Sequence, residues 1–232
     1  MDKECNVELA AAREVEEGLM SAKLEHPITN LCLSPDATAV AVGDVSGQIS
    51  FYIIEAAALK FAHNWKPATA SPIKDLFFLD NLNSMEQFWR YCVAFDEDGR
   101  QLYLYECENW SCIGRLRLES SLRLGKFIVQ VDPTARYIVL VDIDGANLFC
   151  VSLEYAGNGV PSFSSISQIC FYHPLVAVAP FDVKDLDTNQ NDFSFDEDDS
   201  HTEKQETVIS LISITPRHVL HVDVTLDRPP PR

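Results

Sequence analysis

The segment PDATAVAVGDVSGQISF, residues 35–51, decides the fold, because a variant of it, PTARYIVLVDIDGANLF, returns at residues 133–149. A third related segment, CVAFDEDGRQLYL, lies between them at residues 92–104. Proline, aspartate and glycine keep their spacing in the two outer copies, at Pro35, Asp44 and Gly47 and at Pro133, Asp142 and Gly145. The outer copies are 98 positions apart (133 minus 35), so one repeating unit is about half that long.

Each copy contains an apolar run that ends in the motif D-x-[SD]-G and then resumes with alternating apolar and polar residues. The aspartate of such a motif can accept hydrogen bonds from its own downstream backbone, and the glycine can adopt the positive φ of a tight hairpin turn. The motif therefore predicts a structural turn at the same place in each unit, formed by Asp44 and Gly47, by Asp96 and Gly99, and by Asp142 and Gly145.

Four strand-like runs make up each of the first three units. The expected strands are residues 28–33, the apolar run before Asp44, 48–54 and 60–65; then 73–79, the run before Asp96, 101–106 and 110–118; then 127–131, the run before Asp142, 147–153 and 163–171. Four antiparallel strands in about 45 to 50 residues are typical of a WD40-like propeller blade. The Trp-Asp dipeptide of such repeats is missing here, so the blades are degenerate. A β-sandwich is the alternative, but it does not predict the same turn motif in every unit.

A fourth unit is expected at residues 175–183 and 206–226, interrupted by an acidic insertion at about 184–206. Ten acidic residues face only two lysines between Asp182 and Glu206. Such a segment buries too little apolar surface to offset its ordering entropy, so we expect a disordered, solvated loop. Phe193 and Phe195 within it are candidate partner contacts.

The first residues differ from the rest of the chain. Val7, Ala11, Val15 and Leu19 recur every four residues, which predicts an amphipathic helix packed on the first blade or on a partner. The sequence thus predicts an all-β fold, a WD40-like β-propeller that is incomplete, with about four blades and a short N-terminal helix. Its parts are a helical segment at 1–25, the partial propeller at 26–226 and a Pro-rich tail at 227–232.

Charge and motifs exclude several classes of function. The chain has 232 residues, with 18 basic against 35 acidic side chains and a net charge of −17, which opposes direct binding to nucleic acid or to a membrane surface. It contains no apolar stretch of the length of a signal peptide or a membrane span, so we expect it in the cytosol or nucleus. The sequence has no G-x-x-x-x-G-K-[ST], G-x-G-x-x-G or G-x-S-x-G motif.

The seven cysteines include no C-x-x-C pair, so we interpret them as reduced core residues and not as zinc ligands. We therefore expect no catalytic, cofactor or metal site. An enzyme that uses a propeller's central channel stays as an alternative, on fold analogy alone.

Four further segments carry a family resemblance: HNWKP (63–67), QFWRYCV (87–93), NWSCIGRLRL (109–118) and FSSISQICFYHP (163–174). In this order they resemble the propeller region of the enhancer of mRNA-decapping protein 4 family, called Hedls in animals and Varicose in plants. The resemblance covers about residues 26–183 and, more weakly, 206–226. FWRYCV and FSSIS followed by His173-Pro174 are specific to it, since a generic WD40 consensus includes neither.

The resemblance implies a non-enzymatic scaffold of the mRNA-decapping complex in cytoplasmic processing bodies, which promotes cap removal before 5′ to 3′ decay. The implied partners are the catalytic subunit of the decapping enzyme, its activator subunit and other mRNA-decay factors. The family's propeller should have about seven blades. We therefore expect this chain to be part of a larger propeller, an alternative product of a longer gene, or a half completed by self-association or by another chain. A WD40 adaptor for a different assembly is the alternative function.

Overall fold

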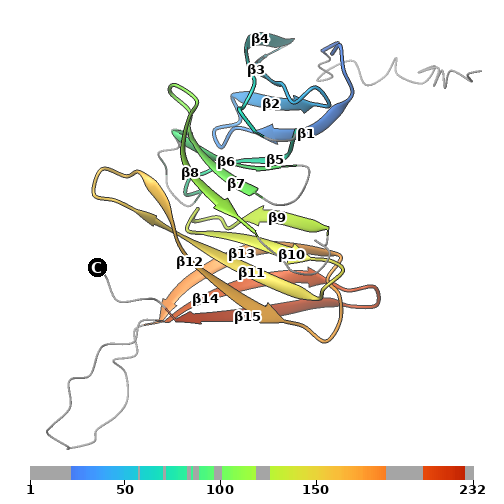
Figure 1. The fold of residues 1–232 in the computed structure, drawn as a ribbon, viewed down its shortest axis with the longest axis vertical. Helices are drawn as coiled ribbons and strands as arrows, with labels where there is room; N and C mark the ends of the chain where they lie inside the picture. Colours follow the sequence, from blue (N-terminus) through green and yellow to red (C-terminus); the bar gives the residue numbers. More distant parts are fainter. Residues whose placement is uncertain are drawn as a thin grey trace, which may run out of the picture.

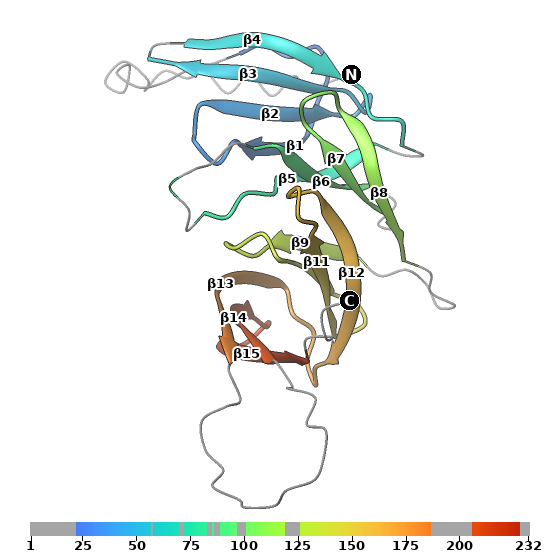
Figure 2. The same cartoon turned by 90° about the vertical axis from the view of Figure 1, so that its left-hand side faces the viewer.

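The computed structural model describes residues 22–56, 58–69, 72–82, 85, 89–96, 101–118, 126–186 and 206–227. These residues form fifteen strands in four antiparallel sheets, and the sheets follow one another along the long axis of the molecule (Figures 1 and 2). No helix in this part of the chain is long and apolar enough to cross a membrane.

Each sheet is one blade, with its strands paired in chain order. Blade 1 consists of β1 (Ile28–Leu33), β2 (Ala39–Asp44), β3 (Ile49–Glu55) and β4 (Ala58–Trp65); blade 2 of β5 (Ile73–Phe78), β6 (Tyr91–Asp96), β7 (Gln101–Glu106) and β8 (Ser111–Arg117); blade 3 of β9 (Phe127–Val131), β10 (Tyr137–Asp142), β11 (Asn147–Tyr155) and β12 (Pro161–Cys170); and blade 4 of β13 (Ala177–Leu186), β14 (Glu206–Ile214) and β15 (Val219–Asp227). The fourth blade therefore has three strands among the described residues.

The second strand of each complete blade is apolar throughout because both of its faces are covered. Nearly every residue of β2, β6 and β10 is buried, whereas β4, β8 and β12 alternate between exposed and half-buried residues. A strand that lies between two packed layers needs an unbroken apolar run, and an outer strand needs only alternation.

The first strands of the blades lie next to one another, with β1 beside β5, β5 beside β9 and β9 beside β13. Side chains connect them: Asn30 Nδ2 donates to the Ile73 carbonyl at 3.1 Å, and Lys74 Nζ donates to the Phe127 carbonyl at 2.7 Å. This row of inner strands is the order expected along the axis of a propeller.

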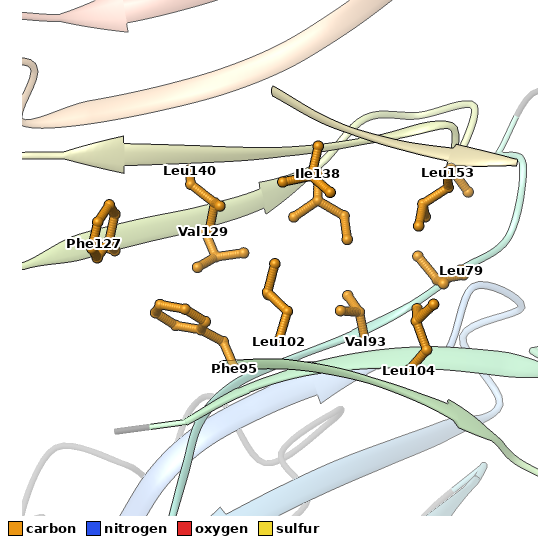
Figure 3. Close-up of a cluster of buried hydrophobic side chains, with 12 residues drawn as sticks. Leu79, Val93, Phe95, Leu102, Leu104, Phe127, Val129, Ile138, Leu140 and Leu153 are labelled. Carbon is orange, nitrogen blue, oxygen red and sulfur yellow. The ribbon is translucent and has the colours of Figure 1, made fainter. Parts of the chain in front are cut away.

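Cores between blades hold the arc together. Figure 3 shows the core between blades 2 and 3, where Phe95, Leu102 and Leu104 meet Ile138 and Leu140. Of these five side chains, four are fully buried and Phe95 is 1% exposed, so each contributes about 1.5 to 3 kcal/mol. Similar clusters join blade 1 to blade 2 and blade 3 to blade 4.

The predicted fold class, an incomplete all-β propeller with about four blades, is confirmed, but one boundary differs. Strand β13 continues to Leu186 and pairs there with Glu206, so the loop expected at 184–206 starts later than predicted. Asp185 stays in the strand because it accepts from Arg136 Nη1 at 2.9 and 3.1 Å and from Thr207 Oγ1 at 2.8 Å. Most of the helix predicted at 1–25 and most of the tail at 227–232 lie outside the described residues.

Candidate interaction surfaces

Two turns, 98 positions apart, share one backbone conformation. They close the β1–β2 and β9–β10 hairpins, and each contains an alanine with a φ of 56°, Ala37 in blade 1 and Ala135 in blade 3. In each turn this alanine N–H donates three residues back, to the carbonyl of Ser34 or of Asp132. The sequence repeat is therefore also a structural repeat.

Asp132 organises the blade 3 turn. Its buried carboxylate accepts from the backbone N–H groups of Thr134, Arg136 and Tyr137 at 2.7, 2.8 and 2.6 Å, and from the Thr134 hydroxyl. The turn also contacts both neighbouring blades, since Leu82 N–H donates to the Pro133 carbonyl and Arg136 pairs with Asp185.

In blade 1 the hydroxyl and the carboxylate exchange places. Ser34 Oγ accepts from the Ala39 N–H at 2.9 Å, while Asp36 accepts from the Ser34 hydroxyl and from the N–H and hydroxyl of Thr38. Burial alone would raise the pKa of Asp36, but these hydrogen bonds together lower it. Ser-Pro-Asp and Asp-Pro-Thr are thus two solutions to the same turn.

The D-x-[SD]-G motif of blade 1 forms a three-residue hairpin loop. Asp44 Oδ1 accepts from the Ser46 N–H at 2.8 Å, the Ser46 hydroxyl at 2.6 Å and the Gln48 N–H at 3.3 Å. Gly47 has a φ of 78°, as the motif predicts. Burial raises the pKa of Asp44, and the Ser46 and Gln48 hydrogen bonds together with the charge of His26 outweigh it, so that the pKa is lowered.

The equivalent motif of blade 3 differs in one respect. Asp142 Oδ1 accepts from the N–H groups of Asp144 and Gly145 at 3.2 and 3.0 Å, but the positive φ belongs to Ala146, at 52°, so the prediction that Gly145 supplies it is wrong. Asp142 pairs with Asn147, which makes this loop one residue longer and moves the left-handed residue along the chain. A Cβ at position 145 would clash with the Asp142 carboxylate and the Asn147 amide, so a larger residue would have to displace these side chains.

The remaining predicted site residues are less fully described. Asp96 is 1% exposed and accepts from the Gln101 N–H at 3.0 Å across the β6–β7 turn. Its partner Gly99 lies outside the described residues, as do Phe193 and Phe195.

The cysteines vary in exposure. Cys92 and Cys150 are buried, and burial followed by the nearby Asp132 charge raises the pKa of Cys150 to about 12. Cys112 and Cys170 are exposed on outer strands, so the prediction that the cysteines are core residues is wrong for these two. No three His, Cys, Asp or Glu side chains of the described ranges are grouped to hold a metal ion.

Two of the segments that carry the family resemblance, HNWKP and NWSCIGRLRL, meet in an aromatic cluster between blades 1 and 2. Trp65 at the end of β4 stacks on Trp110, with ring centroids 4.6 Å apart, and contacts Tyr105 edge-on at 4.7 Å. Phe51 stacks on His63 at 4.5 Å and contacts Trp110 at 4.6 Å. Sequence reasoning used HNWKP and NWSCIGRLRL as separate segments and did not predict that their rings touch.

Blade 1 has an apolar face that points away from blade 2, here called the open face of blade 1. Leu31, Leu33 and Phe61 lie on it with 68%, 53% and 53% of their surface exposed. Leu24 packs over part of the same face, against Val40 and its neighbours. Clustered exposed leucine and phenylalanine side chains are typical of a protein interaction surface.

Blade 4 has a corresponding open face on the side away from blade 3. Ile212, Ile214 and Val219 are 39%, 40% and 70% exposed near the β14–β15 turn. Asp182 and Asp223 lie farther along this face, paired with Lys184 at 2.8 Å and His221 at 3.3 Å. The two ends of the arc therefore differ in polarity.

The stacked antiparallel sheets, three of them four-stranded, and the row of inner strands define a WD40-type β-propeller protein. The fold matches the WD40 domain of Toxoplasma gondii coronin with a TM-score of 0.59 and 10% identity, over 93% of this chain and 50% of that one. Half of a known WD40 domain thus accounts for almost the whole chain, as an open arc requires.

Sequence comparison gives the particular family. A family model described as the WD40 region of Ge1, enhancer of mRNA-decapping protein, matches residues 3–158, and the chain belongs to this family. The chain is 28% identical over 152 residues to the enhancer of mRNA-decapping protein 4 homolog of Drosophila melanogaster and 24% identical over 213 residues to enhancer of mRNA-decapping protein 4 of Xenopus laevis. These matches cover 62% and 87% of this chain, but only 11% and 15% of the relatives.

Proposed function

We propose that the chain is a non-enzymatic scaffold that acts with the mRNA-decapping machinery and promotes cap removal and 5′ to 3′ mRNA decay. The observation that carries this proposal is the family match over residues 3–158. Further support comes from relatives in fly and frog whose names state that they enhance mRNA decapping. Cytoplasmic processing bodies are the location that follows from such a role.

The proposed partners are the catalytic subunit of the decapping enzyme, its activator subunit and other decay factors. The open face of blade 1 is the surface that suits them best, because Leu31, Leu33 and Phe61 together offer an apolar patch. Binding energy at protein interfaces comes mainly from such buried apolar and aromatic anchors. With a net charge of −17, the chain suits protein partners better than RNA.

Affinity purification tests the proposal. Immobilised chain is incubated with cell extract, washed at about 0.15 M and then about 0.5 M salt, and the retained proteins are identified. We expect decapping subunits to remain at the higher salt concentration. The variant Leu31→Asp/Leu33→Asp should lose them, and the control Ile166→Asp should not, since Ile166 is 49% exposed on β12, away from this face. Recovery of an unrelated assembly without decay factors would reject the proposal in favour of another WD40 adaptor role.

A further inference from the structure

A pocket lies where the linker from blade 3 to blade 4 passes the β14–β15 turn, and it is here called the linker pocket. Its volume is about 420 Å³, and it is lined by His173, Pro174, Thr215, Pro216, Arg217 and His218. This volume lies in the range of ligand pockets, about 300 to 1,000 Å³. His173 and Pro174 belong to a segment that carries the family resemblance, and the proposed function makes no use of them.

The linker pocket lies on the blade 3 side of blade 4 and not on its open face. Val178 packs against blade 3 and pairs with Ser213 of β14. Thr215 follows two residues later, so its side chain points to the same side of the sheet. The Thr215 N–H donates to the His218 carbonyl at 2.9 Å, which places His218 opposite Thr215 on this side. The pocket therefore lies between connected parts of two blades and does not depend on the end faces of the arc.

Thr215 organises the turn that carries the charged side chains. It is buried, and its hydroxyl oxygen accepts from the N–H groups of Arg217 and His218 at 3.3 and 3.0 Å. Pro216 has the fixed φ that suits the first corner of such a turn. The side chains of Arg217 and His218 are exposed, and within the described ranges they form no ion pair or hydrogen bond. Their N–H donors are therefore available to a ligand.

The two segments that form the linker pocket contain no acidic residue. Residues 155–181 and 207–222 have neither aspartate nor glutamate, although 35 of the 232 residues of the chain are acidic. Two aspartates, Asp142 and Asp144, belong to the neighbouring β10–β11 turn, but neither lines the pocket. The Asp142 carboxylate accepts from N–H groups of its own turn. The pocket thus presents Arg217 and two histidines to an anion.

The donors favour a phosphoryl group over a carboxylate. An arginine side chain is always charged and offers paired N–H groups that match phosphate oxygens. A histidine ring has an N–H donor in either protonation state. A phosphorylated side chain brings three acceptor oxygens and nearly two negative charges to these three groups, whereas a carboxylate brings two oxygens and one charge. The net charge of −17 disfavours a long polyanion such as RNA.

We propose that the linker pocket binds a phosphorylated serine or threonine in an extended segment of another polypeptide. Arg217 binds the phosphoryl oxygens, and the rings of His173 and His218 donate to them. Pro174 and Pro216, which are exposed beside these donors, contact the residues next to the phosphorylated one. The proposal rests on the residues of the pocket and does not depend on a role in decapping.

NMR titration of the whole chain tests the proposal. The probe is the synthetic peptide Gly-Val-phosphoserine-Pro-Val-Gly, and two control peptides carry serine or glutamate in place of the phosphoserine. We expect the phosphopeptide to shift the ring signals of His173 and His218 and the amide signal of Arg217 in a saturable manner. The glutamate peptide should bind at least tenfold more weakly, and the serine peptide should cause no shift.

Two arginine variants provide a matched pair. Arg217→Gln removes the permanent charge of the pocket and should weaken phosphopeptide binding at least tenfold. Its melting temperature should stay within a few degrees of the parent chain, because the side chain is exposed. Arg115→Gln removes an exposed arginine of β8 in blade 2 and should leave the affinity unchanged. If Arg217→Gln does not fold, the three peptides on the parent chain still decide the question.

Four results would overturn the proposal. Unchanged signals with the phosphopeptide would mean that the pocket binds no phosphoryl group. Equal affinity for the phosphoserine and glutamate peptides would remove the phosphoryl argument. Inorganic phosphate that binds as tightly as the phosphopeptide would show a site for an anion alone. A short oligouridylate that shifts the same signals with higher affinity would assign the pocket to RNA.

Discussion

Replacement of Asp132 by alanine should destabilise the chain by about 3 kcal/mol. The carboxylate is 2% exposed and accepts three backbone N–H groups, at 2.6 to 2.8 Å. The Tyr137 N–H is buried and would lose its acceptor altogether, at a cost of about 1 to 3 kcal/mol. The amides of Thr134 and Arg136 are only partly buried, so water replaces part of their bonds. For a chain of this size the sum corresponds to a fall in melting temperature of about 6 to 12 °C.

The turn of blade 1 provides a rescue variant. Ser34 and Asp36 perform there what Asp132 and Thr134 perform in blade 3, with the two polar groups exchanged. The double change Asp132→Ser/Thr134→Asp transplants the blade 1 arrangement and should restore most of the lost stability. Asp132→Ser alone should stay destabilised, since a single hydroxyl cannot replace a carboxylate that accepts several donors.

Thermal and urea unfolding followed by circular dichroism measure both effects. The reasoning is refuted if Asp132→Ala unfolds within about 0.5 kcal/mol of the parent chain, the range of an ordinary surface substitution. It is equally refuted if the double variant is no more stable than Asp132→Ser.

Three further predictions concern loops and acid stability. Ala37→Gly should raise the free energy of unfolding by about 0.5 to 1 kcal/mol, because Ala37 is exposed and has a left-handed backbone conformation. Ala135→Gly should raise the free energy of unfolding less, because the methyl group that it removes is buried. Urea unfolding compares the two variants. A short Gly/Ser linker in place of residues 187–204 should leave the melting temperature within a few degrees, since β13 and β14 are paired up to the loop and closure depends weakly on length; a large fall would show that the segment packs. Asp44→Asn should make the free energy of unfolding less dependent on pH in acid. The pKa of Asp44 is lowered in the folded state, so its ionised carboxylate stabilises the fold above the ordinary pKa of 3.8. This stabilisation is lost as the pH falls through the folded-state pKa, and the Asn variant lacks it at every pH. Unfolding between about pH 2 and 6 measures this slope, and an unchanged slope would contradict the assignment.

The strands were predictable because the pattern of apolar and polar residues in each strand follows its burial. Strands covered on both faces are apolar throughout, and outer strands alternate. The expected ranges 28–33, 101–106 and 127–131 agree with β1, β7 and β9, and the other strands differ by a few residues at their ends. Apolar runs and turn motifs predict the positions of the strands, and the 98-residue repeat predicts the number of blades. Both can be found in the sequence without any knowledge of contacts.

Other features depend on contacts that sequence spacing does not encode. The positive φ at Ala146 follows from a loop that is one residue longer than the one at Gly47, and the two sequences carry the same motif. The strand residue Asp185 looked like part of an acidic loop, because its partner Arg136 lies in another blade.

The candidate surfaces were only partly predictable. That a short propeller exposes blade faces follows from the blade count, but which leucines lie on them follows from the register of β1 with β2. The contact between Trp65 and Trp110 was not predicted, although both tryptophans lie in segments that carry the family resemblance, because these segments are 45 residues apart in the chain (110 minus 65).

The central claim is that the described residues form an open arc of four blades, with exposed apolar side chains on the outer faces of blades 1 and 4. Light scattering at micromolar concentration, combined with binding of a dye that recognises apolar surface, tests it most directly. The account predicts a molar mass that rises with concentration and strong dye binding, both reduced by Leu31→Asp/Leu33→Asp on the open face of blade 1. A strict monomer that melts cooperatively and binds no dye would contradict the claim, because it would mean that the four blades close on themselves.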